Sequence, residues 1–71
     1  MELRHLEQIL EICRAGGFSG AARKLAISQP TLSKSIARLE AQLSLKLFDR
    51  NGGAARPTAY GAFVAQRAET L

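Results

Sequence analysis

The sequence predicts a mainly α fold: a three-helix core, a two-stranded β-hairpin and the start of a fourth helix. Apolar side chains recur at helical spacing on both sides of a short segment that alternates with period two instead. The turn signal Asn51-Gly52-Gly53 follows that alternating segment, as expected in a β-hairpin. The 71 residues are enough for one small domain and leave no room for a second.

The first helix is predicted over residues 3–15. Its apolar side chains recur every three or four positions, as on one face of a helix that covers a core: Leu3, Leu6, Ile9, Leu10 and Cys13. Gly16-Gly17 ends this helix, because glycine readily takes the left-handed conformation after a last turn. Phe18 then enters the core, and Ser19 is expected to cap a second helix of about two turns that includes Ala21–Leu25.

A third helix is predicted from about Ser28 to about Leu43. Ser28 caps it and Pro30 fits its first turn, where a missing N–H loses no hydrogen bond. One face is apolar and consists of Leu32, Ile36, Leu39 and Leu43. The opposite face carries polar and small residues: Gln29, Ser33, Lys34, Ala37, Arg38 and Gln42. We therefore expect Leu32, Ile36 and Leu39 in the core.

The hairpin is predicted over residues 45–57. Leu45–Phe48 alternates as a strand does, and Phe48 is expected in the core. Ala54–Arg56 returns as the second strand, which Pro57 ends because proline cannot donate to a ladder.

The fourth helix is predicted to begin after Thr58, which caps it. Phe63 and the alanines of this segment fit either the core or the seam of a dimer. No glycine or proline closes the helix, so we expect it to continue to the last residue of a domain cut from a longer protein.

The charge of the chain is concentrated in its middle. The formal net charge is +4, and residues 23–56 alone hold seven basic and two acidic side chains. A basic stripe on a small domain points first to a polyanion such as nucleic acid, although a solvated helical face has the same composition.

The sequence lacks the residues that several functional classes of protein require. A single cysteine, Cys13, cannot form an internal disulfide, and its place on an apolar helical face predicts a buried, inert thiol. The catalytic and phosphate-cradling motifs of enzymes are missing, and so is a cluster of metal ligands. We expect no enzyme, no cofactor and no metal. No apolar run approaches the roughly 18 residues of a membrane span, and a signal peptide is missing, so the chain is expected to be soluble and cytoplasmic.

The short connection between the second and third helices is the layout of a helix-turn-helix, and the hairpin that follows makes it a winged version. In that layout the third helix is free to enter a major groove. Its exposed face begins with short side chains, which permit close approach to base edges. Lys34 and Arg38 flank this face at positions that suit phosphate contacts.

Residues 1–61 resemble the N-terminal DNA-binding domain of LysR-type transcriptional regulators. The resemblance is carried by five segments in order and at the spacing of that family: Leu3-Arg4-His5-Leu6; Gly17-Phe18-Ser19-Gly20-Ala21-Ala22 through Leu25; Ser28–Ser33 with Ile36–Glu40; Leu47–Arg50; and Pro57–Gly61. The resemblance implies a bacterial transcription factor that binds double-stranded DNA as a dimer on an interrupted inverted repeat. It divides the chain into a DNA-binding domain, residues 1–58, and the start of a linker helix, residues 59–71, that pairs two subunits. Full-length members are commonly tetramers, and their effector-sensing domain follows this region, so no effector is expected to bind here.

The resemblance also implies roles for single residues. Gln29, Pro30 and Ser33 correspond to base-contacting positions of the recognition helix. Ser28, Thr31, Lys34, Arg38, Arg50 and Arg56 are the candidates for contacts with the DNA backbone. Arg56 is included because Gly53 stands where many members carry a wing arginine. Ser44 replaces a common glycine after the third helix, so that corner needs another way to turn.

Each of these residues also has an ordinary structural interpretation. Gln29, Ser33, Lys34 and Arg38 fit a solvated helical face, and Thr31 fits a local cap. Arg50 fits an ion pair with Asp49 or Glu40. At the level of the whole domain, a winged helix that binds a protein partner is the competing class, because a fold does not fix a function. Single-stranded RNA binding is less favoured, since the three Phe and one Tyr are not placed as a stacking platform.

Overall fold

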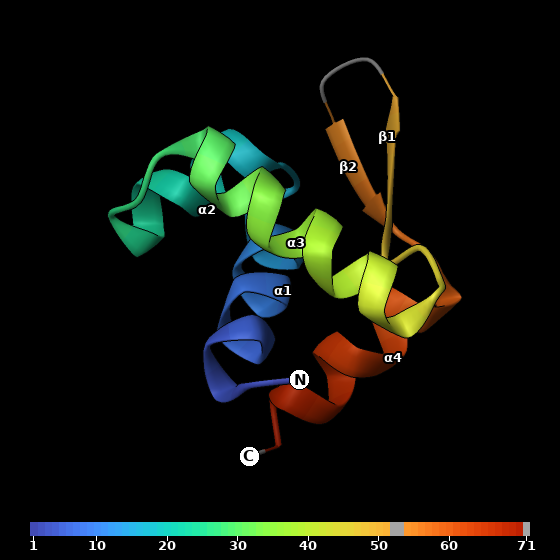
Figure 1. Ribbon diagram of the computed structural model, residues 1–71. Coiled ribbons are helices and arrows are strands. Elements are labelled where there is room, and N and C mark those ends of the chain that lie inside the picture. Colours follow the sequence, from blue (N-terminus) through green and yellow to red (C-terminus); the bar gives the residue numbers. More distant parts are fainter. Residues whose placement is uncertain (52–53, 71) are drawn as a thin grey trace.

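A computed structural model describes residues 1–51 and 54–70 of the chain. Its elements follow in the order α1 (Leu3–Ala15), α2 (Phe18–Leu25), α3 (Gln29–Leu43), β1 (Phe48–Asn51), β2 (Ala54–Pro57) and α4 (Ala59–Ala68). In Figure 1, α3 crosses α1, α2 lies beside the start of α3, and the two strands extend away from the helices as a wing. The predicted winged helix-turn-helix fold, mainly α, is confirmed.

One hydrophobic core joins the helices to the base of the wing. The largest fully buried side chains come from α1, α3 and the segment before β1: Ile9, Ile12, Leu32, Ile36, Leu39 and Leu47. Phe18 and Phe48 are buried as predicted and meet edge to face, with ring centroids 5.8 Å apart. Ala65 of α4 closes the core where α4 packs on α1. The expected core residues of α3 are thus confirmed.

The ends of the helices follow the signals in the sequence at most positions. Gly16 has φ 75° and ends α1 in the left-handed conformation. Ser28 caps α3, and its Oγ accepts from the Thr31 amide at 3.2 Å. Thr58 caps α4 in the same way, accepting from the Gly61 amide at 3.3 Å. These three predictions are confirmed.

The prediction that Ser19 caps the second helix is wrong. The helix begins at Phe18, and the residue before it, Gly17, is extended and makes no side-chain cap. Because Phe18 is anchored in the core, the helix starts earlier than the alanine pattern indicated. Ser19 lies inside the helix, where its hydroxyl donates to Gln29 Oε1 at 3.4 Å.

Two non-glycine residues turn the chain after α2 and α3. Ala26 ends α2 with φ 59°, and the Ile27 amide then donates to the Ala22 carbonyl at 3.0 Å. Ser44 ends α3 with φ 56°, so the corner where the family often has glycine is made by a serine in the left-handed conformation. That conformation costs a residue with a Cβ about 1–2 kcal/mol.

The first strand lies three residues later than predicted. β1 begins at Phe48 and pairs with β2 in antiparallel register, from Phe48 opposite Pro57 to Asn51 opposite Ala54. The backbone before Phe48 is bonded elsewhere: the Leu47 amide donates to Glu40 Oε2 at 2.7 Å, and the Leu47 carbonyl accepts from the Thr58 amide at 2.9 Å. Leu45–Leu47 therefore forms the root of the wing rather than its first strand. β2 ends at Pro57, as predicted.

The fourth helix is shorter than predicted. It ends at Ala68, and the amide and hydroxyl of Thr70 both bond to the Arg67 carbonyl in a tight turn. Its inner face carries Gly61 and Ala65, whereas Phe63 is 62% exposed. Over residues 1–51 and 54–70, no helix has the length and apolar character needed to cross a membrane.

Candidate nucleic-acid interface

The start of α3 presents a polar surface, which we call the α3 polar face: Ser28, Gln29, Pro30, Thr31, Ser33, Lys34 and Arg38. All of these residues are exposed except Ser33, which is half-buried. They project outward because the stripe of Leu32, Ile36 and Leu39 is turned into the core. The structure thus brings together every site residue that the sequence predicted on this helix.

The first turn of α3 is closed by hydrogen bonds between Ser28 and Thr31. Besides accepting from the Thr31 amide, Ser28 Oγ donates its own proton to Thr31 Oγ1 at 2.7 Å. The local cap considered for this turn is therefore present, and it is made by Ser28. Among the described residues the Thr31 hydroxyl makes no further hydrogen bond. The helix N-terminus beside it carries partial positive charge, which favours an anion.

Gln29 is steadied by a contact across the helix-turn-helix. Its Oε1 accepts from the Ser19 hydroxyl of α2, at 3.4 Å. The amide nitrogen of Gln29 remains at the exposed surface as a hydrogen-bond donor. This hydrogen bond thus links the two helices of the motif through the Gln29 side chain.

In the described residues, the cations of the α3 polar face form no ion pairs with carboxylates. Within the described part of the chain, the ion pairs are Arg4–Glu2 and Arg14–Glu11, both on or next to α1. Lys34 and Arg38 are exposed and belong to neither pair. Their charge is therefore directed to the solvent side of α3.

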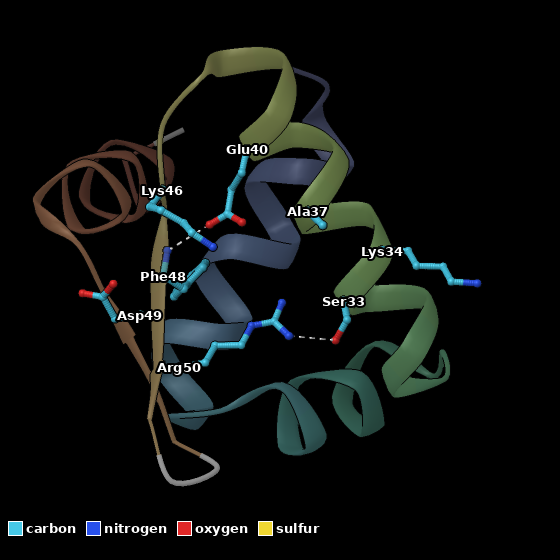
Figure 2. A pocket seen from close by; sticks show the side chains of 8 residues that line it. All are labelled: Ser33, Lys34, Ala37, Glu40, Lys46, Phe48, Asp49 and Arg50. Carbon is cyan, nitrogen blue, oxygen red and sulfur yellow. Dashed lines mark hydrogen bonds between the residues drawn. The ribbon is translucent and has the colours of Figure 1, made fainter.

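Arg50 joins the wing to the α3 polar face. Its guanidinium lies over the Phe18 ring, 3.7 Å from Cζ to the ring centroid, and its Nη1 donates to Ser33 Oγ at 3.4 Å. The ion pair with Asp49 or Glu40 that the sequence left open is not formed. Figure 2 shows why: Asp49 points away on the other side of β1, and Glu40 lies farther along α3.

A groove of about 600 Å³ separates α3 from β1. We call it the wing groove; its lining residues are Ser33, Lys34, Ala37, Glu40, Lys46, Phe48, Asp49 and Arg50. Glu40 lies near the root of the wing, where one carboxylate oxygen accepts from the amides of both Leu47 and Phe48, at 2.7 and 3.2 Å. The sequence did not predict that Glu40 would accept from these two amides. The only signal was the position of Glu40 between the polar and apolar faces of the helix.

The second strand of the wing carries the remaining candidate, one residue pair from the root of the hairpin. Arg56 is exposed on β2, opposite Asp49 in the strand register. Gly53, where the family often has arginine, lies outside the described residues.

Cys13 lies away from this surface, on α1. It is half-buried against the core rather than fully buried as predicted. Burial raises the pKa of its thiol, and the negative charge of Glu69 raises it further. A thiol in this setting stays protonated and unreactive at neutral pH.

The sequence and fold match one family of known proteins. The family model described as bacterial regulatory helix-turn-helix protein, lysR family, matches residues 3–62. The small neutral protease regulatory protein of Streptomyces coelicolor (strain ATCC BAA-471 / A3(2) / M145) is 42% identical over 71 residues, which are 100% of this chain and 22% of that protein. The uncharacterized HTH-type transcriptional regulator YwbI of Bacillus subtilis (strain 168) is 48% identical over 52 residues, which are 73% of this chain and 17% of that protein. The chain thus spans about a fifth of the length of these relatives.

Solved structures with the same fold include complexes with DNA. The BenM DBD/catB site 1 DNA complex is 39% identical with a TM-score of 0.92, and the match covers 100% of this chain and 79% of that chain. The CbnR DBD–DNA complex is 31% identical with a TM-score of 0.90, and covers 99% and 80%. Full-length BenM is 39% identical with a TM-score of 0.88, and the match covers 23% of its chain.

Proposed function

Since the chain belongs to the LysR family of bacterial regulatory helix-turn-helix proteins, we propose that it binds double-stranded DNA in a sequence-specific manner. It does so as the DNA-binding part of a bacterial transcriptional regulator rather than as an enzyme, in the cytoplasm where the chromosome lies. The observation that carries the proposal is the α3 polar face: an exposed helix start with short side chains, flanked by cations that no carboxylate neutralises in the described residues. The likeness to DNA-binding domains in complex with DNA supports it.

In this proposal α3 lies in the major groove and its first two turns read bases. Gln29 supplies a steadied amide donor, Pro30 an apolar contact and Ser33 a hydroxyl. Their short or fixed side chains allow the helix to approach the base edges closely.

Contacts with the DNA backbone set the register of the helix. Thr31 and Ser28 offer a hydroxyl pair at a helix N-terminus, and Lys34 and Arg38 offer charge along the solvent side of α3. Arg50 and Arg56 add positive charge to opposite faces of the wing, which follows the adjacent minor groove or its phosphates.

Residues 1–58 form the DNA-binding domain in this proposal, and residues 59–71 are the start of a linker helix that pairs two subunits. Phe63 is 62% exposed and Tyr60 is 59% exposed on the outer side of α4, which suits such a seam. The dimer would occupy an interrupted inverted repeat, with two α3 helices about one DNA turn apart. Higher oligomers and effector binding belong to the longer regulator.

Substitutions on the α3 polar face test the proposal. A duplex selected from a random pool with the wild-type protein is compared with the unselected pool by fluorescence anisotropy. Gln29→Ala is expected to cost roughly 1–3 kcal/mol on the selected duplex and far less on the pool. Lys34→Ala should weaken both alike and reduce the salt slope by about one unit. Arg14→Ala, which removes a cation of α1, is the control and should leave the slope unchanged.

If Gln29→Ala lowers the affinity for both DNAs equally, Gln29 does not read bases. An unchanged slope for Lys34→Ala would leave Lys34 as a solvated side chain. Binding to a protein that persists at high salt, with no DNA binding at low salt, would favour a protein-interaction domain instead.

Pairing through α4 is tested separately by sedimentation. The helix has ten residues and is about 15 Å long, so the seam is short and residues 1–71 should dimerise only weakly. Phe63→Ser should weaken the association further. A tight dimer at low concentration would contradict the expected weakness, and a dimer insensitive to Phe63→Ser would move the seam elsewhere.

A further inference from the structure

The guanidinium of Arg50 is held by side chains from two helices. Phe18 of α2 supplies a ring face 3.7 Å from Arg50 Cζ, and Ser33 of α3 supplies the Oγ that accepts from Nη1. The ring is fixed in turn, because Phe18 is 4% exposed and meets Phe48 edge to face at an interplanar angle of 75°. In Figure 2, Arg50 reaches across the wing groove from β1 directly to Ser33. The guanidinium is therefore in place before any ligand arrives.

This contact determines what the Ser33 hydroxyl offers to a ligand. A serine hydroxyl has one proton and two lone pairs, and it ordinarily donates or accepts with equal ease. Arginine donates only and stays protonated in proteins, so Ser33 has no way to give its proton to Arg50. One lone pair of Oγ is occupied by the cation, which also polarises the hydroxyl. The Ser33 hydroxyl therefore becomes a stronger hydrogen-bond donor toward a ligand, and its remaining lone pair becomes a weaker acceptor.

Building on the proposed function, we propose that Arg50 is a specificity-determining positioning residue that makes Ser33 read DNA as a hydrogen-bond donor. In the major groove guanine presents only acceptors, at N7 and O6, thymine presents O4, and cytosine presents only the N4 amino donor. At the base that Ser33 faces, the domain therefore prefers guanine or thymine and rejects cytosine. The approaching amino group of cytosine would meet the cation as well as the weakened lone pair.

This role is compatible with a backbone contact by the same side chain. A guanidinium has five N–H donors, and the bond to Ser33 uses one of them. The stacking on Phe18 limits the orientations of the remaining donors. A phosphate contact alone would strengthen binding to every sequence alike, whereas control of Ser33 changes the ranking of bases at one position.

The experiment measures that ranking. Selections with the wild type and with Ser33→Ala identify the base pair whose preference depends on Ser33. Four duplexes that differ only at this pair are then titrated by anisotropy. The wild type should bind the better of the guanine and thymine duplexes about tenfold more tightly than the cytosine duplex.

Arg50→Ala should reduce this preference to within about twofold while preferences at the other pairs persist. The double variant Ser33→Ala/Arg50→Ala should flatten the ranking no further, because both changes remove the same interaction. Phe18→Leu keeps an apolar side chain in the core but lacks the ring face, so it should flatten the ranking partly. Arg14→Ala should leave the ranking as in the wild type.

The outcomes separate this inference from the proposed function. If Arg50→Ala weakens the four duplexes equally and keeps their ranking, the inference is overturned and DNA binding stands. A wild type that prefers no selected duplex over the random pool fails the proposed function itself. Circular dichroism checks that each variant is folded. Should Arg50→Ala be unfolded, Arg50→Met takes its place, since methionine keeps a long apolar side chain beside Phe18 but has neither a charge nor an N–H donor for Ser33. A ranking retained in that variant would overturn the inference equally.

Discussion

Gly61→Ala is the substitution for which the structure and general helix propensity predict opposite signs. Gly61 lies in the first turn of α4, where alanine would ordinarily stabilise the helix by about 1 kcal/mol. A Cβ at this position would overlap the Leu47 carbonyl oxygen and lie 3.3 Å from Pro57 Cβ. The glycine is therefore required by the close approach of α4 to the root of the wing.

The backbone at Leu47 has little freedom to move away. Its carbonyl accepts from the Thr58 amide at 2.9 Å, and its amide donates to Glu40 at 2.7 Å. Displacing the carbonyl would weaken a hydrogen bond worth about 1 kcal/mol, which offsets the gain in helix propensity. The net effect is then the steric overlap of the new Cβ, which destabilises the fold by about 1–3 kcal/mol. For a domain of this size that corresponds to a fall in Tm of roughly 4–24 °C.

Thermal unfolding followed by circular dichroism measures the effect. Gly20→Ala of α2 is the matched control, because its Cβ would come close only to the Cβ of exposed Ala15, at 3.2 Å, and to no backbone carbonyl. We expect a change within about 1 kcal/mol for this control. A Tm for Gly61→Ala equal to or above that of the wild type would mean that the approach of α4 to Leu47 does not require a glycine.

Three further predictions concern the helices. Ser44→Gly should stabilise the domain by about 1 kcal/mol in urea unfolding, because glycine adopts φ 56° without strain; a loss of stability would contradict the left-handed corner. Ile36→Ala, at a fully buried position, should cost about 2–5 kcal/mol and lower the urea midpoint; a cost under 1 kcal/mol would place Ile36 outside the core. Because the folded state raises the pKa of the Cys13 thiol, the associated stability is present at neutral pH and is lost as pH rises through the folded pKa. The pH profile of the rate of alkylation by iodoacetamide should therefore have its midpoint at a higher pH than that of free cysteine, and Glu69→Gln should lower that midpoint. A midpoint at or below that of free cysteine would be evidence against the burial of this thiol.

The helices were predictable because their signals are local. The apolar spacing and the flanking residues Gly16, Ser28 and Thr58 set the start or end of α1, α3 and α4 within their own segments. Ser19 misled the prediction for α2, because the burial of Phe18 outweighed a favourable capping residue.

The wing was predictable as a hairpin but not in its register. Leu45–Phe48 has the predicted alternation, but only Phe48 joins the ladder, and Leu45–Leu47 packs against the core and forms the root of the wing. The amides of Leu47 and Phe48 bond to Glu40, a residue of α3 that no local pattern connects to them. Tertiary hydrogen bonds of this kind displace the start of the strand to Phe48.

The candidate site divides in the same way. Helical geometry alone places Gln29, Ser33 and Lys34 on one exposed face. The place of Arg50 depends on three elements meeting, and the sequence offered the neighbouring carboxylates as partners instead of Phe18. No sequence pattern indicates that a buried aromatic ring such as that of Phe18 will also stack with an arginine.

DNA binding and sequence reading are both assigned to the α3 polar face. A fluorescence-anisotropy titration across salt concentrations, with a selected duplex and a random pool, tests this assignment most directly. We expect the affinity to fall steeply with salt, with a slope near −0.9 per phosphate neutralised, and the selected duplex to bind at least about a thousandfold more tightly than the pool. No binding to either DNA at low salt would mean that the α3 polar face is not a DNA-binding surface.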